Sequence, residues 1–138
     1  MNVSIIYVNY NSSNLIVSSI NSVIELTKDI SYEIIVVDNN SSIEDKDKLK
    51  IYCNSKNIKV IESNINLGFG KGNNLGAKHA KGEYLFFLNP DTYLINNAIY
   101  QLFNFAKERN ILTCGANLFS ANHKPTLSYW MLMPSIKD

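Results

Sequence analysis

The fold is decided by residues 33–42, EIIVVDNNSS, and residues 84–91, YLFFLNPD. Each begins with a run of β-branched or aromatic residues and stops at a polar cluster, which is typical of a buried strand followed by a loop. Both runs are apolar on the two faces of a strand, so each predicts a strand of a parallel sheet covered by helices. Pro90 ends the second run because proline cannot donate to a central ladder.

Outward from these two runs, the chain alternates between strand and helix patterns. Five strands are predicted, over Val3–Val8, Glu33–Val37, Ile58–Ile61, Tyr84–Leu88 and Ile111–Leu118. Helices are predicted over Leu15–Thr27, after the capping pair Ser42 and Asp45, over Gly72–Ala80 with Gly82 as terminator, and from Ile95 to Ala106. Short connections and right-handed crossovers then favour an α/β fold with a doubly wound, mostly parallel, Rossmann-like sheet and helices on both faces.

Composition narrows the class of protein. The 138 residues fit one domain, 1–138, and the net charge of +1 excludes the basic field of a nucleic-acid-binding protein. No apolar run has membrane-spanning length, and the N-terminus lacks the features of a signal peptide. We therefore expect a cytoplasmic protein, either free or at the inner face of the cell membrane. Cys53 and Cys114 are expected to be reduced packing residues.

Polar residues follow four successive strands. In an open parallel sheet, ligands bind outside the carboxyl ends of the strands, so these residues are the candidate site. The candidates are Asn9, Tyr10 and Asn11 after the first strand, Asp38 and Asn40 after the second, Asn66, Gly68, Lys71, Asn73 and Asn74 after the third, and Asn89 and Asp91 after the fourth.

Each group has two interpretations when taken alone. Asp38 is either a ligand of a ribose or base, or a helix cap or turn residue. The segment Gly68–Gly76, GFGKGNNLG, matches neither a Walker A loop nor a dinucleotide fingerprint. It is either a phosphate or ribose cradle with Lys71 as its charge, or a flexible turn. Asn89-Pro90-Asp91 is either a pair of oxygen ligands for Mg²⁺ or Mn²⁺, or a plain turn.

The combination of motifs resembles a known family. VSIIYVNYNS, IIVVDNNS and NINLGFGKGNNLGAKHAKGEYLFFLNPDT occur in the order seen in family 2 glycosyltransferases of the GT-A fold. The sequence is most similar to their rhamnosyltransferase-like branch, which builds bacterial surface polysaccharides. The resemblance runs from about Val3 to Thr92 and continues more loosely to Thr126.

The resemblance implies a nucleoside-diphosphate sugar donor, UDP- or dTDP-linked, and a saccharide or lipid-linked acceptor. It implies that Asn9 and Tyr10 line the nucleotide pocket, that Asp38 bonds the pyrimidine base and that Asn66 to Asn74 close over base and ribose. Asn89-Pro90-Asp91 matches the family's Asp-x-Asp metal motif with the first Asp replaced by Asn. Asp91 is then the only anionic ligand, and Mn²⁺ or Mg²⁺ would bind together with the donor diphosphate.

The same resemblance leaves the general base of the acceptor half unassigned. Glu108 and Asp138 are the only acids after Asp91, and neither lies in a matching context. We therefore expect the nucleotide-sugar-binding portion of a transferase, and no sugar transfer by these residues alone. The alternatives are a nucleotide-binding module without catalysis and an unrelated doubly wound domain. The apolar stretch Trp130–Met133 either packs on the sheet or forms an interface with another copy or a missing half.

Overall fold

The structure is a computed structural model that describes residues 1–120, 122 and 124. Its sheet has four parallel strands in the order β3-β2-β1-β4. The strands are β1 (Val3–Asn9), β2 (Tyr32–Asp38), β3 (Lys59–Glu62) and β4 (Tyr84–Phe87). The helices are α1 (Ser13–Leu26), α2 (Ile43–Ser55), α3 (Gly68–Ala77) and α4 (Ala98–Glu108). The predicted α/β class and parallel sheet are confirmed.

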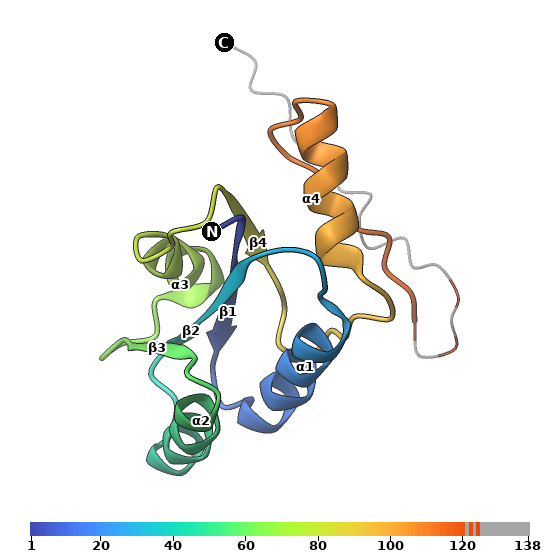
Figure 1. The fold of residues 1–138 in the computed structure, drawn as a ribbon. Coiled ribbons are helices and arrows are strands. Elements are labelled where there is room, and N and C mark those ends of the chain that lie inside the picture. Colours follow the sequence, from blue (N-terminus) through green and yellow to red (C-terminus); the bar gives the residue numbers. More distant parts are fainter. Residues whose placement is uncertain (121, 123, 125–138) are drawn as a thin grey trace.

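Helices cover both faces of the sheet (Figure 1), as predicted. On one face, a buried cluster joins β1 and β2 to α1, α2 and α4, and includes Ile5, Tyr7, Ile16, Leu49 and Ile99. Ile5 and Tyr7 are two residues apart in β1, so both side chains lie on this face of the sheet. Helix α3 lies on the opposite face, where its two buried glycines leave room for β1 and β2.

The sheet ends earlier than predicted. The prediction of a strand over Ile111–Leu118 is wrong, because this described stretch forms none. Strand β4 is therefore the edge among the residues that the structure describes, and Leu85 and Phe87 on its α3 side are 42% and 48% exposed. A strand forms only where a neighbour satisfies its backbone N–H and C=O groups, and the apolar pattern of residues 111–118 cannot supply that neighbour.

Smaller differences have steric causes. Helix α3 begins at Gly68 and ends at Ala77, so Gly82 does not terminate it. A Cβ on Gly82 would instead lie 2.4 Å from the backbone nitrogen of Ser4, so only glycine allows the chain to pass this close to β1.

The two cysteines differ in burial. Cys53 is buried, and burial raises the pKa of its thiol to about 11. Cys114 is exposed, contrary to the expectation of a packing residue. Trp130–Met133 lies outside the described residues.

Candidate functional site

The carboxyl ends of the four strands lie along one edge of the sheet, because all the pairings are parallel. Asn9 is the register partner of Asp38, which is the register partner of Glu62. The ladder continues past these ends: the Asn39 N–H donates to the Asn9 carbonyl and the Ser63 N–H to the Asp38 carbonyl, both over 2.8 Å. The structure thus brings the predicted polar residues of the first three strand ends side by side.

A buried polar network begins at Asn9, at the end of β1. Its Nδ2 lies 3.1 Å from Asp38 Oδ1, 3.0 Å from Ser41 Oγ and 2.7 Å from Asp45 Oδ2. Asn9 is fully buried and Asp38 is 1% exposed. Buried polar groups stabilise a structure only when they are paired, as these are, so the network fixes the turns after β1 and β2 relative to each other.

The second oxygen of Asp38 is also occupied. Oδ2 accepts the Ser41 N–H over 3.2 Å and lies 3.5 Å from the ammonium of Lys46. The bond to Ser41 fits the interpretation of Asp38 as a turn residue. Both oxygens of this 1% exposed carboxylate already have partners, and the base contact of Asp38 stays a prediction.

Helix α2 is attached to this edge by charges as well as by apolar packing. Lys46 and Lys50, one helical turn apart, pair with the carboxylates of Asp38 and Glu62 at the ends of β2 and β3. The Lys50–Glu62 distance is 2.9 Å. Burial raises the pKa of Asp45, but hydrogen bonds from Asn9 and Ser13 outweigh it and hold the pKa below its usual value. Asp45 is therefore a carboxylate at neutral pH.

A second network joins the end of β2 to the glycine-rich segment. The Asn39 side chain is 3% exposed; its Nδ2 donates to Asn66 Oδ1 over 2.9 Å and its Oδ1 accepts the Leu67 N–H over 2.8 Å. Asn66 Oδ1 also accepts the Gly68 N–H, and Gly68 has a φ of +75° that favours glycine. Asn39 therefore holds the segment at the start of α3.

The sequence-based choice of Asn40 over Asn39 missed this role. Asn40 is exposed and has a φ of +67°, and Asn11 after β1 has a φ of +52°. Asparagine adopts this left-handed conformation more readily than most residues, which gives both positions a conformational reason for their side chain. Two adjacent asparagines after a strand point in different directions, and the sequence offers no signal that tells which one faces inward.

The remaining candidates divide by exposure. Asn73 is buried on α3, and its contact with the nucleotide stays a prediction. Tyr10, on the loop after β1, is 52% exposed and presents a ring beside the two networks. The other candidates on the first three loops are exposed as well, namely Asn11, Asn40, Asn66, Gly68, Lys71 and Asn74.

The end of β4 forms a tight turn. The Asn89 carbonyl accepts the Thr92 N–H over 3.2 Å and the Thr92 hydroxyl over 2.7 Å, and the Asn89 and Asp91 side chains are exposed. Within the described part of the chain, no group of three or more His, Cys, Asp or Glu side chains could hold a metal ion. Asn89 and Asp91 are oxygen donors of the kind that Mg²⁺ and Mn²⁺ prefer, but one carboxylate needs further oxygens from a bound ligand.

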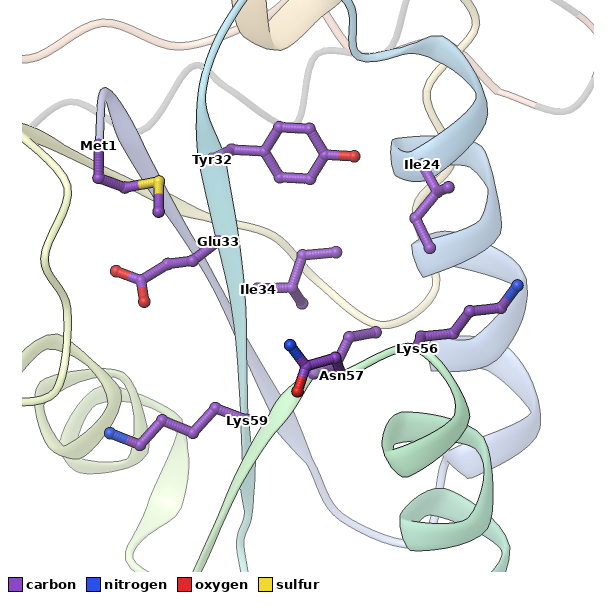
Figure 2. A pocket seen from close by; sticks show the side chains of 9 residues that line it. Met1, Ile24, Tyr32, Glu33, Ile34, Lys56, Asn57 and Lys59 are labelled. Atoms are coloured by element: carbon purple, nitrogen blue, oxygen red, sulfur yellow. The ribbon is translucent and has the colours of Figure 1, made fainter.

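A pocket of about 520 Å³ lies away from this edge (Figure 2). It opens at the start of β2 and β3, where Tyr32, Ile34 and Ile24 form its apolar part. Figure 2 shows Lys56 and Lys59 pointing away from each other, and Glu33 already accepts the Ser4 hydroxyl and the Lys81 N–H. No polar groups converge in this pocket, so its size alone does not make it a functional site.

Comparison with known proteins decides the family. A family model described as "Glycosyl transferase family 2" matches residues 4–132. The chain belongs to this family. A curated poly(ribitol-phosphate) beta-glucosyltransferase from Bacillus spizizenii is 38% identical over 111 residues, which are 78% of this chain and 18% of that protein. The rhamnosyltransferase-like branch stays a prediction, since this relative is named for other chemistry.

Solved structures of glycosyltransferases confirm the GT-A fold. A crystal structure of TarS 1–349 from Staphylococcus aureus with UDP has a TM-score of 0.67 and 31% identity, over 80% of this chain and 33% of that one. The mannosyltransferase PcManGT from Pyrobaculum calidifontis, with GDP-Man and Mn²⁺, has a TM-score of 0.70 over 86% of this chain and 36% of that one. At 20% identity it supports the fold alone.

The chain spans about a third or less of the length of these proteins. None of its described helices is long and apolar enough to cross a membrane. The described residues include all four strand ends of the candidate site.

Proposed function

We propose that this chain is the donor-nucleotide-binding part of a glycosyltransferase that takes its sugar from a UDP- or dTDP-linked donor. The observation that carries the proposal is the shared edge, where loops after four parallel strands bring exposed polar side chains together in a family 2 fold. The UDP complex of the TarS relative favours UDP over dTDP. The acceptor is a saccharide or a lipid-linked group of bacterial surface polysaccharide synthesis, in keeping with the name of the poly(ribitol-phosphate) relative.

The division of the edge into buried and exposed residues assigns the roles. Asn9, Asp38 and Asn39 are buried and paired, so they hold the loops. The exposed residues of these loops contact the nucleotide: Tyr10 offers a ring to the base, and Lys71 a positive charge to the diphosphate. The general base that would deprotonate the acceptor is not assigned to any residue.

A divalent cation fits this scheme only as a partner of the diphosphate. Asp91 would hold Mn²⁺ or Mg²⁺ with Asn89 beside it, and phosphate oxygens would complete the coordination. The ion would neutralise charge on the diphosphate leaving group when bound.

We expect Mn²⁺ to strengthen UDP binding by the wild-type chain and to strengthen it much less in Asp91→Ala. Asp91 is exposed and supplies the anionic side chain of the proposed site, so its loss leaves only an amide and the phosphates for the ion. Calorimetric titration of UDP, with and without Mn²⁺, measures the difference. A loss of at least about 1 kcal/mol of the enhancement is expected, which is the scale of one charged contact.

Asp47→Ala is the matched control for this experiment. Asp47 is an exposed aspartate on α2, so its removal changes the net charge equally. Equal Mn²⁺ enhancement in wild type and Asp91→Ala would place the cation elsewhere. A wild-type chain that binds neither UDP nor dTDP, with or without Mn²⁺, would contradict the proposed function itself.

A further inference from the structure

The first turn of α1 is capped by a residue of another helix. Ser12, its N-cap residue, makes no side-chain cap hydrogen bond. The Ser13 N–H donates instead to Asp45 Oδ1 over 3.0 Å, and Asp45 lies in the first turn of α2. A carboxylate at this position both satisfies an N–H that has no intrahelical acceptor and complements the positive end of the helix dipole.

The other oxygen of Asp45 fixes the residue before this turn. Asp45 Oδ2 accepts from Asn9 Nδ2 over 2.7 Å, the shortest of the three contacts of that amide. Asn9 Oδ1 in turn accepts the N–H and the hydroxyl of Ser12, over 3.2 and 3.0 Å. One carboxylate therefore fixes both ends of the loop 10–12.

The loop between these two anchors faces solvent. Tyr10 is 52% exposed, and Asn11 is exposed with a left-handed φ. Asn11 also braces the neighbouring loop, since its N–H donates to Ser41 Oγ over 3.0 Å and its Oδ1 accepts the Ser42 N–H over 2.8 Å. The capping pair Ser42 and Asp45 uses only the backbone of Asp45, whose N–H donates to Ser42 Oγ over 3.4 Å. The Asp45 side chain is not needed for this cap and reaches α1 instead.

We propose that Asp45 is a positioning residue, which acts through Asn9 and the first turn of α1 to hold the loop 10–12 in the conformation that meets the nucleotide. This inference rests on the proposed function, because it assumes that this loop contacts UDP. It assigns no contact between Asp45 and the nucleotide. A preformed loop binds more tightly because less conformational entropy is lost on binding.

Asp45→Asn tests the proposal with little change of shape. Asparagine has one acceptor oxygen, so its amide must face either Asn9 Nδ2 or the Ser13 N–H, and both of these are donors. We expect the Kd for UDP to rise about tenfold, the usual scale for losing a charged hydrogen bond, at a temperature where both proteins are fully folded. In ¹⁵N-resolved NMR spectra of the free proteins, the Ser13 N–H and Asn9 side-chain resonances should shift.

Glu44→Gln is the control, because Glu44 occupies the same helical turn and its one side-chain partner among the described residues is Lys48, over 2.8 Å. It should leave both the Kd for UDP and these resonances unchanged. An unchanged Kd in Asp45→Asn, with normal binding by the wild type, overturns the positioning role and leaves the proposed function intact. Absence of UDP binding by the wild type overturns the proposed function. Unshifted Ser13 and Asn9 resonances would refute the anchoring contacts whatever the ligand.

Discussion

Asp38→Ala is expected to lower the free energy of unfolding by about 3 kcal/mol. Where the variant is partly unfolded, its apparent affinity for UDP should fall with the folded fraction. Asp38 accepts from Asn9, from the Ser41 N–H and from Lys46 while it is 1% exposed. Alanine removes the acceptor of the Ser41 N–H and the carboxylate beside Lys46, while the Asn9 amide keeps Ser41 Oγ and Asp45 Oδ2 as acceptors. The ammonium of Lys46 can turn to solvent because its side chain is 20% exposed, so the cost falls short of that of a fully buried pair.

Urea unfolding at neutral pH measures this effect, and Asp47→Ala supplies the control. Asp47 is exposed on the same helix, so its loss should change the free energy of unfolding by no more than about 0.5 kcal/mol. A value for Asp38→Ala within about 1 kcal/mol of wild type would mean that the network does not support the fold.

Asp38→Asn separates the structural role from the predicted base contact. Asparagine keeps the size of the side chain but replaces one carboxylate oxygen with an NH₂ group, which is a donor. That group must face other donors, either Asn9 Nδ2 or the Ser41 N–H and Lys46. The variant should be less destabilised than Asp38→Ala and still folded at low temperature. If the folded variant binds UDP with wild-type affinity, Asp38 does not bond the base.

The first four strands could be predicted because each has apolar side chains that lie in the core or pack against it. Their β-branched or aromatic runs stop at polar residues, and the structure confirms a strand at every one of these four positions. Ile111–Leu118, ILTCGANL, differs from these runs because it contains Gly115, Ala116 and Asn117, which are depleted in strands, and it is not a strand. A strand also needs a partner edge for its backbone N–H and C=O groups.

The candidate site could be predicted as a place more readily than as a set of contacts. Period and topology locate the edge where Asn9 and Asp38 end their strands, and the structure places them together there. Sequence period and strand topology do not indicate that Asn39, rather than Asn40, faces the glycine-rich segment. They also do not indicate that the Asp45 side chain contacts α1. Those contacts depend on side-chain directions after the last ladder bond, where the alternation of the strand no longer applies.

The glycine-rich composition of residues 68–72 also led to a wrong prediction of where α3 begins. Residues 68–72 suggested a loop before a helix beginning at Gly72, but α3 starts at Gly68. Glycine is a poor helix former, so its presence normally argues for a turn. Here Gly72 and Gly76, one turn apart, face the sheet, and their missing side chains allow α3 to pack against Val8 and Ile6. Tertiary packing outweighs the local propensity.

This close packing makes Gly76→Ala strongly destabilising, by about 2 kcal/mol after the gain in helix propensity is subtracted. A Cβ at Gly76 would lie 2.6 Å from Ile6 Cγ2 and 3.2 Å from Val37 Cγ2. Ile6 and Val37 are β-branched and fully buried, so neither can move aside without disturbing the sheet. Helix α3 must therefore shift away from β1 and β2.

Gly70→Ala is the matched variant on the same helix, because no other described residue brings an atom within 4 Å of a Cβ at Gly70, apart from its chain neighbours and the backbone of α3 itself. There the preference of helices for alanine acts alone, and the free energy of unfolding should rise by about 0.5–1 kcal/mol. Urea unfolding of the two variants should thus move in opposite directions. If both are stabilised, α3 does not pack on the sheet through Gly76. The shift of α3 should also weaken UDP binding by folded Gly76→Ala, because Lys71 and Asn74 lie on the same helix and move with it.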